Sequence, residues 1–439
     1  MKKIGILAFV FLLGFTNYAQ NKKWTLEEAV AYAIENNISV KQSELDLRLT
    51  EINKKDAIGN FLPNLNGSAS ISSNTGANIN PLTNTIEVNT FASLTTGFQS
   101  NLTLFDGLRN IKQLQRSKLE IVASQYNLAK MKDDIALFVA NAYLQVLFNK
   151  ENLKVLKAQN EITKEQLNRT NELVDAGVVP RGDLLEIKST AASEEQRIVI
   201  AENQITISLI SLAQTLLIKD YENFEVVDSE YELPMSTILE QSVYDIIEKA
   251  KQERVEVKIA DQNVELAEKD LQITRGGYYP TLSAFAGYNT RWSDNDFFNR
   301  NFFAQLDENY GTFFGVQLQV PVFNGLAVRN NVERSKINIE RANLQKAQAN
   351  LDIEANVYQA YTDVKGALKA YEAALVAEEA QLQAYEYSQS RFDVGFLNSF
   401  DFSQSKLRLE NAQSEVIRTK YDYIFKLKLL ELYFGISLY

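Results

Sequence analysis

The sequence contains neither cysteine nor histidine, and only 6 of its 439 residues are proline. Without cysteine, the chain can form no disulfide and carry no lipid on an N-terminal cysteine. The missing histidine and thiol side chains are also the usual general base, thiol nucleophile and soft metal ligands of proteins. We therefore expect no metal site, no cofactor and no enzymatic activity.

Long apolar runs are also missing. After the N-terminus, no stretch approaches the roughly 18 consecutive apolar residues of a transmembrane helix. Residues 1–19 combine Lys2 and Lys3, a short apolar run and the small-residue ending Asn17-Tyr18-Ala19, which predicts a cleaved secretory signal peptide. The alternative, an uncleaved anchor, is disfavoured because the run is too short to span a bilayer. The formal net charge of −11 argues against a nucleic-acid partner.

The longest uninterrupted stretch, residues 108–176, contains no glycine and no proline. An unbroken helix of that length would measure roughly 100 Å, about three times the ~30 Å hydrocarbon core of a bilayer. A turn at 177–182 precedes a second long helix that begins near Asp183. Its apolar residues follow the spacing of an antiparallel coiled-coil seam: Leu184, Ile187, Ala191, Ile198, Ala201, Ile205, Leu212 and Leu216.

Two pairs of segments alternate between apolar and polar residues, which predicts strands with one apolar and one polar face. The first pair is 65–73 and 94–104, with Asn74–Asn89 as an intervening loop. The second pair is Leu282–Trp292 and Thr312–Val320. Strands of roughly ten to twelve residues suit a tilted crossing of a bilayer.

The connection between the second pair of strands, residues 293–309, is rich in aromatic residues: Phe297, Phe298, Phe302 and Phe303. Two interpretations remain open for this cluster. It forms part of an aromatic girdle at a membrane interface, or its rings pack on one another within the loop.

Motifs in the first half of the chain recur in the second half at a nearly constant offset. Leu104-Phe105-Asp106-Gly107 matches Val322-Phe323-Asn324-Gly325, Asp175-Ala176-Gly177 matches Asp393-Val394-Gly395, and Lys188 matches Lys406. This single repetition predicts a duplication. The expected domains are the signal peptide 1–19, a first repeat 20–219, a connector 220–239 and a second repeat 240–439.

Four strands per chain cannot close a barrel, and lipid does not tolerate open strand edges. Bacterial barrels have at least eight strands. Two chains would reach that minimum with a narrow interior, whereas three chains would supply twelve strands and a lumen. The expected fold class is therefore mainly α with membrane β: long antiparallel helical hairpins that form a trimeric α-barrel, joined to a twelve-stranded outer-membrane β-barrel.

The sequence resembles the TolC-type outer-membrane efflux proteins over essentially all of the mature chain. The resemblance rests on motifs that occur in order and mostly twice. They are Thr25-Leu26-Glu27-Glu28-Ala29-Val30, Glu35-Asn36-Asn37, Leu62-Pro63, the two Phe-Asx-Gly strand exits, and Gly177 and Gly395 followed by Asp183 and Asp401.

The resemblance implies a homotrimeric channel in the outer membrane that extends into the periplasm. Its partners would be outer-membrane lipid, a periplasmic adaptor protein and an inner-membrane pump, in a tripartite efflux or type I secretion system. The sequence has no phosphate-binding loop, so the channel would be a passive conduit for small molecules. The alternatives are an outlet for secreted proteins and, in a different class, a structural periplasmic coiled-coil protein without a pore.

The resemblance also assigns a pore constriction to four residues: Asp183, Glu186, Asp401 and Gln404. A ring of carboxylates there would favour cations and bind multivalent ones. An aspartate just after a turn is also a good helix N-cap. For Asp183, helix capping is favoured over a role in the pore. For Asp401, the role in the pore is favoured, because Ser399 could cap that helix instead.

The resemblance further assigns adaptor contact to the tips of the hairpins, at Gly177, Val178, Gly395 and Phe396. Both glycines also suit left-handed helix stops. The tyrosine and arginine that close the tip in the family are replaced here by Phe392 and Leu397. Another set of contacts must therefore close this tip, and Arg181 is a candidate.

Overall fold

A computed structural model describes residues 22–79, 84–228, 237–296 and 298–436. The expected signal peptide, residues 1–19, lies outside these ranges. Within them, none of the helices combines the length and apolar character that crossing a membrane requires. The chain forms two compact units that each draw on both halves of the sequence: unit 1 comprises residues 1–41, 132–247 and 356–439, and unit 2 comprises 42–131 and 248–355.

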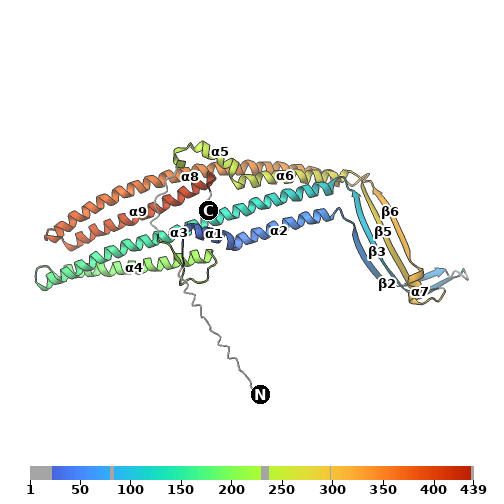
Figure 1. Cartoon of the computed structure of the whole chain (residues 1–439), viewed down its shortest axis with the longest axis horizontal. Helices are drawn as coiled ribbons and strands as arrows, with labels where there is room; N and C mark the ends of the chain where they lie inside the picture. Colours follow the sequence, from blue (N-terminus) through green and yellow to red (C-terminus); the bar gives the residue numbers. More distant parts are fainter. Residues whose placement is uncertain (1–21, 80–83, 229–236, 297, 437–439) are drawn as a thin grey trace, which may run out of the picture. The chain divides into compact units, whose positions relative to one another are not determined.

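Unit 2 contains a four-stranded antiparallel sheet in the order β2-β3-β5-β6 (Figure 1). Its strands are β2 (Asn64–Ile79), β3 (Ile86–Phe105), β5 (Thr281–Ser293) and β6 (Gly311–Gln319). The pairing register aligns Leu102, Ala284 and Val316 on one face, which we call the apolar face. The same register aligns Thr103, Ser283 and Gln317 on the opposite, polar face. The predicted alternation is confirmed for both pairs of strands.

The predicted loop Asn74–Asn89 is wrong for most of its length. β2 continues to Ile79 and β3 begins at Ile86, so that the strands remain paired through this polar stretch. Serine and threonine hydroxyls bond across the pair, as in the 2.8 Å contact between Thr75 and Thr90. Such cross-strand pairs stabilise a sheet, but in the sequence the same residues read as a loop.

The connection 293–309, expected to be a loop, contains a short helix, α7 (Phe302–Glu308). Asn301 caps it by accepting a hydrogen bond from the N–H of Ala304 at 2.8 Å. Helical periodicity is not visible over a segment this short. Phe297, one of the aromatic residues noted there, lies outside the described residues.

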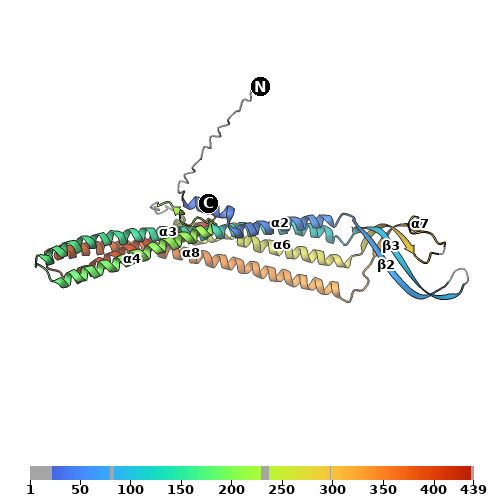
Figure 2. The same cartoon turned by 90° about the horizontal axis from the view of Figure 1, so that it is seen from below.

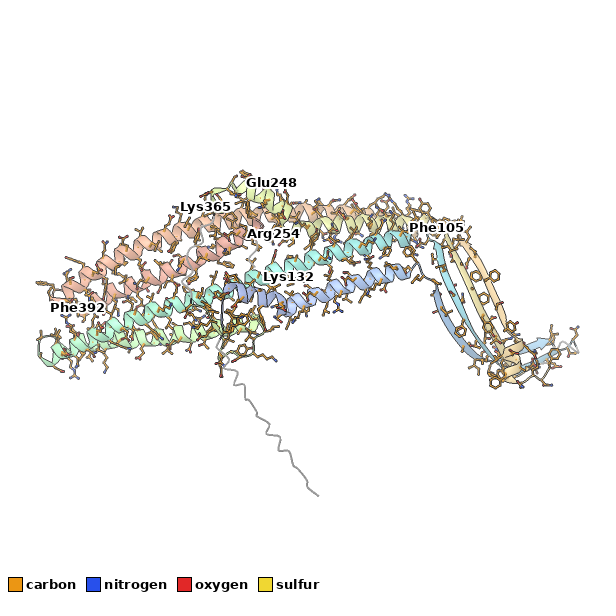
Figure 3. The ribbon with its side chains drawn as sticks, viewed as in Figure 1. Phe105, Lys132, Glu248, Arg254, Lys365 and Phe392 are labelled. Atoms are coloured by element: carbon orange, nitrogen blue, oxygen red, sulfur yellow. The ribbon has the colours of Figure 1, made fainter. Side chains whose placement is uncertain are left out.

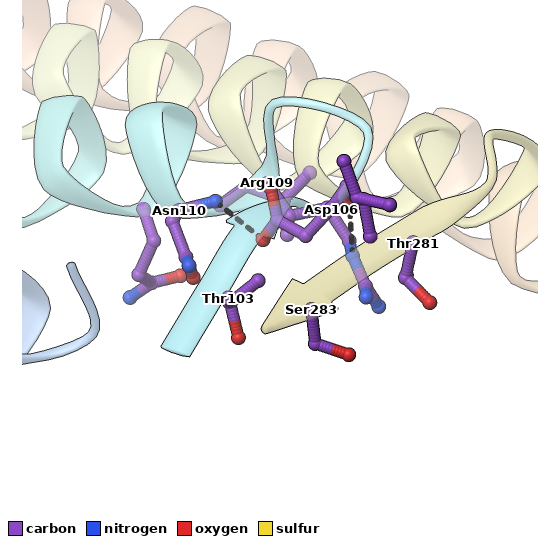
Figure 4. A pocket seen from close by; sticks show the side chains of 9 residues that line it. Thr103, Asp106, Arg109, Asn110, Thr281 and Ser283 are labelled. Atoms are coloured by element: carbon purple, nitrogen blue, oxygen red, sulfur yellow. Dashed lines mark hydrogen bonds between the residues drawn. The ribbon is translucent and has the colours of Figure 1, made fainter. Parts of the chain in front are cut away.

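The junction of β3 and α3 (Arg109–Asp175) explains the Phe-Asp-Gly motif. The buried carboxylate of Asp106 accepts a hydrogen bond from the N–H of Asn110 at 2.9 Å, and its carbonyl accepts one from Arg109 Nε at 3.0 Å (Figure 4). Gly107 has φ +74°, and a Cβ there would lie 2.3 Å from the carbonyl oxygen of Gly276. Glycine is therefore required for both backbone conformation and close packing.

The helices of unit 2 lie side by side. They are α2 (Ile38–Gly59), α6 (Val255–Arg275) and the sheet-proximal parts of α3 and α8 (Ala327–Asp393) (Figure 2). Arg116 of α3 pairs with Asp270 of α6 at 2.6 Å, and Lys346 of α8 pairs with Asp261 of α6 at 2.7 Å. These ion pairs place α6 between α3 and α8.

Unit 1 contains the turns and the larger part of two long helical hairpins. α3 turns into α4 (Arg181–Thr215), and α8 turns into α9 (Ser399–Tyr433). The first helix of each hairpin has 67 residues and the second has 35. The long helix and the returning helix predicted for residues 108–216 are thus confirmed. The repeat boundaries 20–219, 220–239 and 240–439 stay a prediction.

The remaining elements of unit 1 pack around the bases of these hairpins. α1 (Leu26–Asn36) begins with a capping box formed by Thr25 and Glu28. The expected connector, residues 220–239, contains β4 (Glu225–Val226), which pairs in parallel with β1 (Lys23–Trp24). η1 (Thr237–Glu240) also lies in unit 1, the boundary between the units falls within α5 (Val243–Glu253), and η2 (Gly276–Tyr278) lies in unit 2.

Candidate functional site at the hairpin tips

Both hairpins turn at a glycine in the left-handed conformation. Gly177 has φ +74° and Gly395 has φ +80°. The N–H of Val178 donates to the carbonyl of Leu173 at 2.8 Å, and the N–H of Phe396 makes the equivalent bond in the second hairpin, also at 2.8 Å. This is the hydrogen bonding of a Schellman motif. The prediction that both glycines stop their helices is confirmed.

A cavity of about 470 Å³ lies between the two tips. It is lined by Val178 and Asp183 of the first hairpin and by Gly395 and Phe396 of the second. Val178 and Phe396 are largely exposed. The structure thus brings three of the residues assigned to adaptor contact to one surface.

The prediction that Asp183 caps α4 is wrong. The N-cap is Pro180, and the N–H of Asp183 itself donates to the Pro180 carbonyl at 3.1 Å. The Asp183 carboxylate instead accepts a hydrogen bond from the hydroxyl of Ser399 at 2.8 Å. It therefore joins the start of α4 to the start of α9.

The prediction that Ser399 caps α9 is wrong as well, since Asn398 occupies that position. Its side-chain oxygen accepts from the N–H of Asp401 at 2.8 Å, and its amide donates to the Asp401 carboxylate at 2.9 Å. Asp401 is exposed in the first turn of α9. Its carboxylate is thus held in place without being buried.

Glu186 and Gln404 line one cavity of about 430 Å³ between α4 and α9. Both side chains are exposed. Together with the bond from Ser399 to Asp183, this places all four residues assigned to the constriction along the same end of the α4–α9 pair. Sequence spacing alone could not establish that proximity.

The contact between the tips differs from each of the candidates in the sequence. Arg169 of α3 pairs with Asp393 of α8 at 2.6 Å. Arg181, the expected substitute, makes no ion pair within the described part of the chain. At the tips, the arginine that pairs across the two hairpins therefore comes from the body of the first helix.

Phe392 and Leu397, which depart from the family's closing residues, form an apolar cluster instead. Phe392 lies near the tip of the second hairpin (Figure 3). Its ring stacks on Phe402 with centroids 4.7 Å apart, and the ring of Tyr385 lies 5.7 Å from that of Phe402. Leu397 packs against the same buried group. The second tip is thus held by aromatic packing within its own hairpin.

A buried ion pair joins α4 and α9 farther along the hairpins. Lys406 is 3% exposed and Glu194 is 5% exposed, and their charged atoms lie 3.0 Å apart. Lys406 also donates to the carbonyl of Gln159 and to the hydroxyl of Thr163, both on α3. Asn160 donates to the second oxygen of Glu194 at 3.2 Å. One lysine thus connects three helices.

Arg197 and Glu410 form a second ion pair next to the first. Burial raises the pKa of the Glu410 carboxyl, although the charge of Arg197 opposes the shift. Burial likewise lowers the pKa of the Lys406 ammonium, against the attraction of Glu194. The network therefore holds charge in a region from which water is largely excluded.

The raised pKa of Glu410 predicts a pH dependence. Since the folded chain holds this proton more tightly than the unfolded chain, the contribution of Glu410 to stability is complete below its ordinary pKa of 4.5. It is lost as the pH rises through the raised value. We expect Glu410→Gln to flatten this part of the pH profile of the unfolding temperature in detergent. A profile identical to the wild type would contradict this assignment.

These features define the class of protein. It is a duplicated chain with two long helical hairpins and a four-stranded sheet whose faces differ in polarity. The chain belongs to the outer membrane efflux protein family, whose model matches residues 30–216 and 246–435. It is accordingly an outer-membrane protein of the efflux class, and the resemblance to TolC-type proteins noted in the sequence is confirmed.

Individual relatives are distant in sequence. The outer membrane protein TolC of Vibrio cholerae is 26% identical over 312 residues, which cover 69% of this chain and 67% of TolC. The pyoverdine export outer membrane protein OpmQ of Pseudomonas aeruginosa is 22% identical over 64% of this chain and 55% of its own length. The aligned part thus spans little more than half of OpmQ. The fold matches the crystal structure of the Campylobacter jejuni CmeC outer membrane channel, with a TM-score of 0.79, 19% identity and coverage of 95% of this chain and 86% of CmeC.

Proposed function

We propose that three copies of this chain form a channel through the outer membrane and the periplasm, through which small molecules leave the cell. The observation that carries the proposal is a four-stranded sheet, apolar on one face and polar on the other, whose two edge strands have no partner in the described chain. In a membrane such edges must be paired. Copies of the same chain supply the complementary edges, so that β6 of one copy pairs with β2 of the next.

The faces of the sheet agree with this arrangement. Phe314, Val316 and Leu318 of β6 are exposed on the apolar face, where lipid would cover them. On the polar face, Gln317 and Thr103 would border the lumen. A β5 strand of 13 residues rises roughly 40 Å and, tilted by about 40°, spans about 30 Å. That distance matches the hydrocarbon core.

Two helices of unit 2, α2 and α8, each expose a row of apolar residues, which we call the seams on α2 and α8. On α2, Leu45, Leu49 and Ile52 are exposed. Each of them follows a less exposed residue by two positions, so it lies on the side of the helix opposite to the residues that pack inward. On α8, Ile337, Leu344 and Leu351 are exposed at intervals of seven residues. The seams on α2 and α8 are different surfaces, so a contact between them is heterologous, and with a threefold rotation such contacts close into a ring. Three chains give twelve strands, enough to leave a lumen.

The hairpin tips would form the narrow end of this tunnel. Asp183 and Asp401 from three chains would place carboxylates around one constriction, with Glu186 and Gln404 beside them. The surface of Val178, Gly395 and Phe396 would contact a periplasmic adaptor, which links the channel to an inner-membrane pump. OpmQ is by name a pyoverdine export protein, which supports a small-molecule cargo.

Single-channel recording tests the constriction. We expect the double variant Asp183→Ala, Asp401→Ala to conduct more than the wild type and to lose block by trivalent cations, because the carboxylate ring that binds them is gone. The matched control is Asp46→Ala, Glu340→Ala, which removes the same charge from exposed positions on α2 and α8. Unchanged currents and unchanged block in the tip variant would remove these residues from the pore.

A further inference from the structure

The connection between β5 and β6 is folded onto one face of the sheet. The hydroxyl of Thr290 donates to the carbonyl of Leu306 in α7 at 2.6 Å, and the rings of Trp292 and Phe302 lie 5.7 Å apart. Thr290 and Trp292 alternate in phase with Ala284, so both stand on the apolar face. α7 therefore covers the end of that face farthest from α6, the helix that precedes β5.

Polar contacts fix this conformation. Gln305 is 2% exposed, and its side chain donates to the carbonyls of Ser293 and Arg300 and accepts from the N–H of Ser293. Arg300 pairs with Asp296 at 2.6 Å and with Glu308 at 2.8 Å. The hydrogen bonds from Arg300 lower the pKa of Asp296 to about 2, so the ion pair between these two residues stays charged at neutral pH.

This fixed segment holds large aromatic rings outward. Phe303 is 79% exposed, Phe298 is 72% exposed and Tyr310 is 60% exposed. A segment that buries a glutamine while exposing phenylalanines reverses the usual preference of these residues. Tyr310 stacks on Tyr288 of the apolar face with ring centroids 6.1 Å apart, and Phe314 of the same face is also exposed.

We propose that α7 and its flanking aromatic residues anchor the channel in the interfacial layer of the lipid bilayer, at the end of the sheet remote from the long helices. The proposal rests on the proposed function, in which the apolar face contacts lipid. Aromatic side chains favour this layer, and barrel proteins carry aromatic girdles where their strands leave the hydrocarbon core. Here the girdle is a folded helix held on the outside of the strand, rather than side chains of the strand itself.

The chain's two tryptophans permit a direct test. In the background Trp24→Phe, Trp292→Phe, one tryptophan is introduced at a time, by Phe303→Trp, Phe314→Trp or Phe313→Trp. The proteins are reconstituted in phosphatidylcholine vesicles whose acyl chains carry bromine either near the glycerol backbone or near the chain end. Bromine quenches tryptophan only at short range, so the pattern reports depth.

We expect Phe303→Trp to be quenched several-fold more by bromine near the glycerol backbone than by bromine near the chain end. Phe314→Trp, near the middle of β6 on the apolar face, reports on the proposed function and should be quenched by deep bromine. Phe313→Trp, which lies over Gly287 on the polar face, should be quenched by neither.

The outcomes separate the two proposals. If Phe314→Trp is quenched and Phe303→Trp is not, the anchor is wrong, and the exposed rings contact water or another protein. If Phe314→Trp is not quenched, the apolar face does not meet lipid and the proposed function itself fails. Quenching of Phe303→Trp mainly by deep bromine would also overturn the interfacial position.

Discussion

Replacing Leu344 and Leu351 by aspartate is expected to convert the assembled channel into monomers. Both residues are largely exposed in the single chain, at 72% and 60%, so the variant chain should fold normally. In the proposed ring they meet α2 of the neighbouring chain, where aspartate would be buried without a partner. An uncompensated buried charge costs about 3–5 kcal/mol, which is more than a hundredfold in affinity for each contact. Size measurement in detergent and heat-labile migration on gels check the result.

The matched control is Asn338→Asp, Gln345→Asp. These exposed residues follow Ile337 and Leu344 by one position, so the new carboxylates are turned by about 100° from the seam. We expect this control to assemble like the wild type. Circular dichroism of both variants tests whether the helices remain intact. A Leu344→Asp, Leu351→Asp chain that stays multimeric would show that the seam on α8 does not face a sister chain.

The parts of the fold that follow from local pattern were predictable. Leu108–Ala176 contains neither glycine nor proline, so its sequence predicts a single long helix. The four strands were visible because side chains alternate with a period of two. Two features could not be predicted from the sequence. The extension of β2 and β3 around Thr75 was missed because paired strands rich in serine and threonine have the composition of loops. The helix α7 was missed because seven residues are too few to show a helical period.

The candidate site was predicted less well. The positions of Asp183 and Asp401 followed from resemblance, but the bond from Ser399 to Asp183 depends on how two distant hairpins meet. The buried ion pair was missed, although a signal was present. Glu194 lies in the apolar seam of α4, seven residues after Ile187 and seven before Ala201. A charge in a seam position requires a buried partner, and only the structure identifies that partner as Lys406.

Removing Glu194 from this buried ion pair is expected to have the largest effect on the stability of the hairpins. Glu194→Ala leaves the Lys406 ammonium buried without its counter-charge, which should destabilise the packing of α9 by about 3–5 kcal/mol. The unfolding temperature in detergent and hydrogen exchange along α4 and α9 measure the loss. Glu195→Ala is the control, because Glu195 is the next residue of α4 and carries the same carboxylate but is exposed. An equal effect of both substitutions would contradict the role of burial.

Replacing both Glu194 and Lys406 distinguishes the effect of the ion pair on stability from its effect on the register of the helices. Glu194→Leu with Lys406→Met removes the pair without leaving a buried charge, and such replacements are often neutral or stabilising. A single buried polar contact can fix the register of helices whose apolar seam would otherwise allow a shift. We therefore expect the double variant to unfold near the wild-type temperature but to lose a unique alignment of α9 on α3.

Since the chain has no cysteine, Asn152→Cys with Ser414→Cys reports this alignment, because these two side chains lie 2.9 Å apart. Oxidation should join them efficiently with the ion pair intact and poorly without it, whereas equal cross-linking in both backgrounds would show that apolar packing alone sets the register.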